Sequence, residues 1–404
     1  MFHSLRQIHA RPQLLLLAFM IFVQGSAYGS TLPYLSITAI RELGMSDQAY
    51  SVLVFVTSVS AVTISVSLGI LSDLIGDRRR IMIAMALMGM VGYGAIFLFP
   101  SVPVFIVATA FVIPFFQSVS SLIFVGVRAE TAGLPGRDAA AINATVRAFM
   151  SASWVVMPAA MGLAFAGSAS MMGAWGVAGL SALSIFLCST FLLAKPVGDA
   201  APAKSPTGFF SALSELAAPV MLARMLSMAA LTGTIRLTST LWPLILIVNL
   251  GGKTADVGII AGLIALLEIP FMLMWASLLK RLTILSILIV AGLIYAGFIV
   301  ALAFATTPWQ IYALTIPAAA GAAALLSMPL TYFQDLFPGR PGLGTSFNPI
   351  NSFLGNGLTA MAFAVGAHYL GYSGTAWLGV AMALAGIVGL VLLERRRLTV
   401  VDPT

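Results

Sequence analysis

Charged residues are scarce in this chain. Of 404 residues only 13 are Asp or Glu and 20 are Lys or Arg, which makes 8% of the chain charged against 60% hydrophobic. A soluble globular protein carries roughly 25% charged residues, so this chain cannot cover a water-facing surface. We expect it to lie in a lipid bilayer, where backbone hydrogen bonds must be made internally, by helices or by a closed barrel.

Cysteine and histidine are scarce as well. Cys188 is the single cysteine, so no disulfide can form within the chain. No Lys or His falls in the middle of an apolar run, and Glu268 is the only acid that does. An intramembrane enzyme would need a nucleophile with a base, or clustered metal ligands. We therefore expect no enzymatic activity, no metal and no cofactor.

Apolar runs are what the chain has in abundance. They are about 20 residues long and do not alternate with polar residues, which predicts membrane-spanning helices rather than barrel strands. The sequence thus predicts an all-α polytopic membrane protein with twelve spans, near residues 14–38, 48–71, 81–100, 103–127, 139–166, 171–194, 218–249, 256–279, 284–306, 308–333, 342–367 and 371–393.

The first span resembles a cleavable signal peptide. Arg6 and Arg11 precede "LLLLAFMIFV", and the small residues "GSAYG" follow. Hydrophobicity resumes at once from Leu32 to Ile40, however, and cleavage would leave eleven spans. We expect the segment to be retained as span 1.

Basic residues predict the orientation, because cytoplasmic loops carry an excess of Lys and Arg. With a cytoplasmic N-terminus, the opposite side receives only Arg41 and Lys253, so both termini are expected in the cytoplasm. The net charge of +7 then matches anionic lipid headgroups and implies no nucleic acid. The cytoplasmic set is Arg6, Arg11, Arg78–Arg80, Arg128, Arg137, Lys195, Lys204, Arg224, Lys280, Arg281, Arg340 and Arg395–Arg397.

The chain divides into two similar parts. A polar stretch rich in Pro, Ala, Gly and Ser, residues 195–216, separates six spans in 1–194 from six in 217–404. The tripeptide Pro-Gly-Arg follows span 4 at 135–137 and span 10 at 338–340, a separation of 203 residues (338 − 135). We therefore expect two six-helix halves that arose by duplication, joined by a cytoplasmic central loop.

The loop after span 2, "GILSDLIGDRRRIMI", resembles the signature of the major facilitator superfamily. The residues that fit the signature form a cytoplasmic gate motif; they are Gly69, Ser72, Asp73, Gly76, Arg78 and Arg79. Leu74, where a basic residue is common, and Asp77, ahead of the arginines, depart from the pattern. The alternative is an ordinary hairpin whose basic residues merely mark the cytoplasmic side.

Four stretches together resemble the bacterial sugar efflux transporter family of that superfamily. They are "LPYLSITAIRELG" (32–44), "SDLIGDRRR" (72–80), "VRAFMSASWVVMP" (146–158), and "LEIP" (267–270) with "YFQDLFPGR" (332–340). The resemblance implies a monomeric transporter of the bacterial inner membrane. It also implies export of sugars or glycosides, driven by inward movement of protons.

A sugar transporter needs amides and aromatic rings in a central cavity, since amides pair with sugar hydroxyls and rings pack on sugar C–H faces. Several spans offer such side chains, although packing between helices or anchoring at the membrane surface is the alternative for each. The substrate-binding candidates are Gln24, Tyr28, Gln117, Trp242, Asn348 and Asn351.

Three charged residues, Arg147, Arg236 and Glu268, fall at membrane depth, where charges are usually functional. Counting from the loop at 251–252, Arg236 is about 15 residues back and Glu268 about 16 forward, so they should reach similar depths. Arg147 could lie level with Glu268 too. We hypothesise that Glu268 alternates between a protonated form and a carboxylate paired with either arginine, which would couple transport to protons. A permanent buried ion pair is the alternative.

Other transport functions stay open at this point. Drug exporters of the superfamily often carry a Gly-Pro-rich motif in span 5, of which "VVMPAAMG" keeps only Pro158 and Gly162. A sugar:proton symporter would use the same fold, and a sugar sensor that does not transport would have the same pocket.

Overall fold

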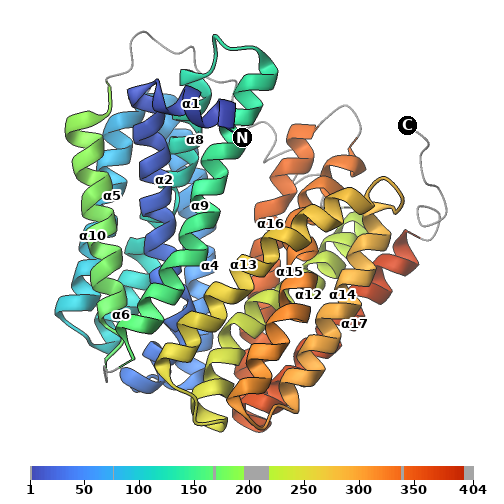
Figure 1. The fold of residues 1–404 in the computed structure, drawn as a ribbon. Coiled ribbons are helices and arrows are strands. Elements are labelled where there is room, and N and C mark those ends of the chain that lie inside the picture. The colour runs from blue at the N-terminus through green and yellow to red at the C-terminus, as the bar shows by residue number, and fades with distance from the viewer. Residues whose placement is uncertain (1, 76, 167–169, 195–217, 338–340, 395–404) are drawn as a thin grey trace. The chain divides into compact units, whose positions relative to one another are not determined.

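The computed structural model describes residues 2–75, 77–166, 170–194, 218–337 and 341–394. Within these ranges the chain forms helices and no strands, as Figure 1 shows. The main helices are α1 (Phe2–His9), α2 (Pro12–Thr31), α3 (Leu35–Ile37), α4 (Asp47–Ile75), α5 (Arg78–Leu98), α6 (Val102–Val107), α7 (Ile113–Gln117), α8 (Val119–Glu130), α9 (Gly136–Ala164), α10 (Gly173–Leu187), α12 (Pro219–Leu244), α13 (Thr254–Leu278), α14 (Ile284–Ala303), α15 (Pro308–Leu336), α16 (Pro341–Tyr369) and α17 (Gly371–Leu393).

Several spans are built from more than one helical segment. A 3₁₀ turn at Leu32–Tyr34 follows α2, and π-helical turns lie at Thr38–Glu42, Ala108–Val112, Cys188–Leu192 and Ile245–Asn249. Pro33 lies in the first of these breaks and Pro114 directly follows another. Because proline lacks the N–H that a helix needs, such breaks are expected beside it.

Eleven segments of the described chain are long and apolar enough to cross a membrane. They match eleven of the twelve predicted spans, with ends that differ by a few residues. The remaining predicted span, 342–367, corresponds to α16, a helix of 29 residues. This helix carries Asn348, Asn351 and Asn356, and it is not among the eleven segments found in the described residues. The predicted all-α fold of twelve spans is confirmed.

The described chain forms two compact units. Unit 1 comprises Met1–Met45, Val59–Ser205 and Val257–Gly262, and unit 2 comprises Ser46–Ser58, Pro206–Asp256 and Leu263–Thr404. The predicted boundary loop 195–216 lies outside the described residues, so the division at that loop stays a prediction. The repeated tripeptide at 338–340 lies outside them as well.

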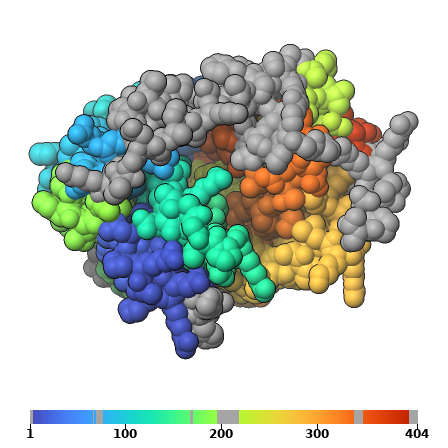
Figure 2. Space-filling model, turned by 90° about the horizontal axis from the view of Figure 1, so that it is seen from above, coloured from blue at the N-terminus to red at the C-terminus, as the bar shows by residue number. Residues whose placement is uncertain are grey.

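Unit 1 is organised around α2, which packs against α9 and α10 and is buried along most of its length. The short helix α1 lies on α9, where Ser4 Oγ is 2.8 Å from Thr145 Oγ1. Figure 2 shows the dark blue surface of α1 beside the teal surface of α9. The first predicted span is therefore an integral part of this unit.

Small residues allow the closest helix contacts, as is usual between membrane helices. In unit 1, a Cβ atom added at Gly258 would overlap the carbonyl oxygen of Pro158. In unit 2, a Cβ atom at Gly386 of α17 would lie 2.6 Å from the carbonyl oxygen of Ser227 and 2.8 Å from the backbone nitrogen of Leu231, both on α12. Since these obstacles are backbone atoms, they cannot move aside without separating the helices.

Replacing Gly386 with Ala should lower the thermal unfolding midpoint of the detergent-purified protein. The added methyl group forces α12 and α17 apart, an overpacking that costs about 1–3 kcal/mol. The matched control is Gly297→Ala on α14, where an added Cβ meets nothing within 4 Å and helix propensity favours Ala by about 1 kcal/mol. Equal midpoints for the two variants would contradict this account of the packing.

Candidate functional site

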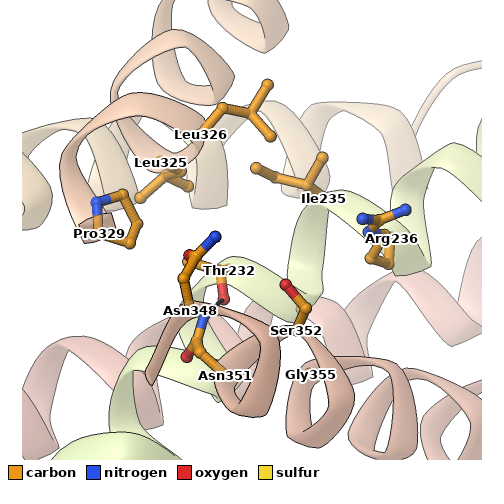
Figure 3. A pocket seen from close by; sticks show the side chains of 11 residues that line it. Thr232, Ile235, Arg236, Leu325, Leu326, Pro329, Asn348, Asn351, Ser352 and Gly355 are labelled. Carbon is orange, nitrogen blue, oxygen red and sulfur yellow. Dashed lines mark hydrogen bonds between the residues drawn. The ribbon is translucent and has the colours of Figure 1, made fainter. Parts of the chain in front are cut away.

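Unit 2 contains a solvent-accessible pocket with a cavity volume of about 200 Å³. Three helices supply its walls: α12, α15 and α16 (Figure 3). Polar side chains come from α12 and α16, whereas α15 contributes an apolar wall. The lining residues are Thr232, Gly233, Ile235, Arg236, Leu325, Leu326, Pro329, Asn348, Asn351, Ser352 and Gly355.

The pocket exists because α12 and α16 cross closely. A Cβ atom at Gly233 would lie 2.9 Å from the carbonyl oxygen of Gly355, and one at Gly355 would lie 3.2 Å from the carbonyl oxygen of Ala229. Next to this crossing, residues one helical turn apart point the same way. Thr232 and Arg236 therefore face the pocket from α12.

A chain of hydrogen bonds sets the orientation of the Asn351 amide. Thr232 Oγ1 donates to the carbonyl oxygen of Met228 at 2.9 Å, which uses its only proton. Asn351 Nδ2 donates to the same Thr232 oxygen at 3.1 Å. Asn351 is only 4% exposed, and its Oδ1 has no hydrogen-bond partner among the described residues. The pocket thus holds a buried, unused acceptor.

Three further polar groups face the open part of the pocket. Arg236, Asn348 and Ser352 are exposed, and none of them forms a hydrogen bond or ion pair with the residues that the structure describes. Figure 3 shows the Asn348 amide and the Ser352 hydroxyl pointing into the space below the apolar wall, with Arg236 at one side. Of the predicted site residues, Arg236, Asn348 and Asn351 come together here.

Glu268 lies on α13 and does not line this pocket. It is half-buried, and the described residues give it no ion pair. Among the described residues, Glu268 and Arg236 form no ion pair despite their similar predicted depth. The proton-coupling role of Glu268 stays a prediction.

The remaining predicted site residues lie apart from the pocket. Trp242, on α12, is 7% exposed and does not line it. In unit 1, the guanidinium carbon of Arg147 lies 4.7 Å from the centre of the Phe124 ring, a cation–π contact. Tyr28 and Gln117 are half-buried in the same unit. Their predicted contacts with substrate stay predictions.

Gln24 has a well-defined place in unit 1. It is fully buried, and its Nε2 donates to the carbonyl oxygens of Phe116 at 3.1 Å and Gln117 at 3.4 Å. These carbonyls lie where α7 ends and α8 begins, and a helix end leaves carbonyls without helical partners. The Gln24 amide supplies the missing donors.

The predicted gate motif is described in part. Gly76 lies outside the described residues, as does the side chain of Asp73, and Arg78 is half-buried. Arg79 Nε donates to the carbonyl oxygen of Ser189 at 2.8 Å, and its Nη2 donates to that of Thr190. Arg79 thereby holds the end of span 6 within unit 1.

Asp77, a departure from the superfamily pattern, has a clear function at the start of α5. Its carboxylate accepts hydrogen bonds from the backbone nitrogens of Arg79 and Arg80, at 3.1 and 3.2 Å, and forms an ion pair with the Arg80 side chain at 2.9 Å. It caps the helix N-terminus, as an aspartate does well.

A buried ion pair in unit 2 was missed by reasoning from the sequence. Glu394, 2% exposed, pairs with Arg224 at 2.5 Å and accepts a hydrogen bond from Tyr332 Oη at 3.2 Å. These groups connect α12, α15 and the end of α17. In the sequence Glu394 directly precedes three arginines, so it resembles a surface charge. The described residues contain no cluster of three or more potential metal ligands.

Comparison with known families identifies the fold. The family model of the Major Facilitator Superfamily matches residues 14–360. The chain belongs to this superfamily. It is accordingly a polytopic membrane transporter and not an enzyme.

Relatives in the superfamily extend along nearly the whole chain, and three of them are named sugar efflux transporters. The first, from Deinococcus radiodurans, is 28% identical and covers 96% of this chain and 99% of that protein. Sugar efflux transporter A of Dickeya chrysanthemi is 26% identical, over 85% of this chain and 86% of its own. Sugar efflux transporter B of Salmonella typhimurium is 27% identical, over 91% and 93%. The resemblance to this family is confirmed.

Solved structures show the same superfamily fold. The nucleoside transporter NupG aligns with a TM-score of 0.78 at 15% identity and covers 94% of this chain and 98% of its own. A POT family transporter in complex with a thioalcohol-conjugated peptide aligns with a TM-score of 0.76 at 11% identity, over 95% and 96%. At such identities the likeness concerns the fold alone.

Replacing Gln24 with Ala should destabilise the transporter. The carbonyl oxygen of Phe116 would lose its side-chain donor, whereas that of Gln117 keeps the Ser120 hydroxyl at 3.3 Å. A buried polar group without a partner costs about 1–3 kcal/mol. The measurement is the thermal unfolding midpoint in detergent. The matched control is Gln117→Ala, since the Gln117 side chain forms no hydrogen bond with the described residues. A Gln24→Ala midpoint no lower than that of the control would contradict this role.

Proposed function

We propose that this transporter exports sugars or glycosides across the bacterial inner membrane in exchange for protons, by alternating access. The observation that supports this most is the pocket of unit 2, in which amide, hydroxyl and guanidinium groups face solvent beside an apolar wall. The three relatives named sugar efflux transporters, which match nearly the full length, support the same substrate class.

The polar groups of the pocket suit a sugar. A sugar hydroxyl both donates and accepts, and the pocket offers donors at Arg236, Asn348 and Ser352 together with the unused acceptor of Asn351. The apolar wall of Leu325, Leu326 and Pro329 suits the C–H face of a sugar ring. Gln24, Tyr28, Gln117 and Trp242 complete the set of proposed contacts.

Proton coupling is proposed for Glu268. A carboxyl group changes its protonation when its contact with water or with a cation changes. Glu268 is half-buried at membrane depth, and no arginine is paired with it among the described residues. Pro270 lies two residues farther along α13, and a proline inside a helix allows it to bend. Bending there would change the surroundings of Glu268, with Arg147 or Arg236 as possible counter-charges. Both termini are proposed to lie in the cytoplasm, and the protein to act as a monomer.

The proposed function is tested with purified protein in proteoliposomes. A panel of labelled neutral sugars and glycosides is assayed for counterflow and for accumulation driven by a pH gradient. We expect counterflow of at least one sugar, with accumulation in exchange for protons. Accumulation of sugar together with protons would instead indicate symport. No flux of any sugar would contradict the proposal.

Replacing Glu268 with Gln should abolish accumulation driven by the pH gradient and keep counterflow, because counterflow needs the sugar site but no proton exchange. The matched control is Glu130→Gln, which removes an exposed carboxylate at the end of α8 and should retain both activities. If Glu268→Gln keeps full gradient-driven accumulation, Glu268 does not couple protons.

A further inference from the structure

Arg236 is a cation in the middle of a membrane span with no counter-charge. Its span runs from Pro219 to Asn249, and the residue lies near the centre of that range. A guanidinium at this depth is unfavourable unless it is hydrated or paired. The described residues offer the Arg236 side chain neither an ion pair nor a hydrogen bond.

The carboxylates of unit 2 that the structure describes form no ion pair with Arg236. Asp47 accepts a hydrogen bond from Tyr372, Asp256 accepts one from Tyr312, and Glu394 pairs with Arg224. Asp335 has an interaction of its own, one residue before the end of α15. Glu268 forms no ion pair with Arg236 or with any other residue that the structure describes. The cation of the pocket is therefore available to a ligand.

From this geometry we infer that the pocket is a binding subsite for a sugar acid: a single sugar ring that carries one carboxylate. The inference rests on the proposed function, that a sugar enters this pocket. The carboxylate pairs with the Arg236 guanidinium, whose planar fork of donors matches a carboxylate in a bidentate manner.

The ring hydroxyls are bound from the other side of the pocket. Asn348, Asn351 and Ser352 lie within about one turn on α16 and share a face. The buried Oδ1 of Asn351 accepts a hydrogen bond from one hydroxyl, while the exposed amide of Asn348 and the hydroxyl of Ser352 bind others. A ligand with hydroxyls at one end and an anion at the other can therefore bind the polar side chains of α16 and the Arg236 guanidinium of α12 at the same time.

Size and charge narrow the class of ligand. A volume of about 200 Å³ is below the roughly 300–1,000 Å³ of pockets for drug-sized ligands, so one ring fits better than a chain of rings. A phosphate group carries a charge of about −1.5 to −2 at neutral pH, which a single guanidinium would leave partly uncompensated. A carboxylate, with one negative charge, matches it.

The test compares two pairs of sugars that differ at one carbon: glucuronate with glucose, and galacturonate with galactose. Each is used to compete against labelled sugar in counterflow with the wild-type transporter. We expect the uronates to compete at lower concentrations than their neutral partners. Arg236→Gln should weaken competition by the uronates about 10- to 100-fold, the effect of losing a hydrogen bond between charged groups, and change that of neutral sugars less than about threefold. Arg236→Lys should weaken competition by the uronates less than Arg236→Gln does.

The matched control is Arg128→Gln, which removes an exposed arginine at the end of α8 and should preserve the preference. Neutral sugars that compete as well as uronates in the wild type would overturn the sugar-acid inference and leave the proposed function intact. If Arg236→Gln weakened competition by uronates and by neutral sugars equally, the sugar-acid inference would likewise be overturned and the proposed function would stand. Counterflow with no sugar of either class would overturn the proposed function, and the inference with it.

Discussion

The pocket depends on one close helix crossing, that of α12 and α16 at Gly233 and Gly355. A Cβ atom at Gly233 would lie 2.9 Å from the carbonyl oxygen of Gly355, and one at Gly355 would lie 3.2 Å from that of Ala229, so the crossing is tight at both glycines. In a membrane no difference in hydrophobicity drives helices together, so contacts between backbones must supply the attraction. The same contact that holds unit 2 together places Thr232 beside Asn351 and leaves Arg236 facing open space.

The few charges of the chain are distributed according to depth. At the helix ends they are compensated: Asp77 caps α5, Arg79 binds carbonyls of span 6, and Glu394 pairs with Arg224. At membrane depth in unit 2, Arg236 and Glu268 have no such compensation from the described residues. Structural charges are thus satisfied where helices end. The two charges at membrane depth lack such partners among the described residues, which is the reason to propose functions for them.

Much of the fold follows from local sequence. Each span could be placed within a few residues because hydropathy and Pro, Gly and charged boundaries act over short distances. The sequence also identified Asn348 and Asn351 as substrate-binding candidates, and both line the pocket. The missing Glu268–Arg236 pair could not be foreseen, because counting residues gives depth but not the direction in which a helix turns a side chain. The burial of Gln24 depends on a break in a distant span, and the pairing of Glu394 depends on tertiary contacts.

The bond between Thr232 and Met228 has a consequence for stereochemical recognition. Because the only proton of Thr232 is donated to Met228, Asn351 must turn its nitrogen toward Thr232, and its oxygen is left as a buried acceptor without a partner among the described residues. The Asn351 oxygen can therefore bind only a group that donates a hydrogen bond. A ring position at which the hydroxyl is methylated, fluorinated or substituted by an aglycone has no proton to give, and it would leave the Asn351 oxygen unsatisfied. Under the proposed function, the orientation that Thr232 imposes on Asn351 would thus require a free hydroxyl at one position of the ring and restrict the orientation of a bound glycoside.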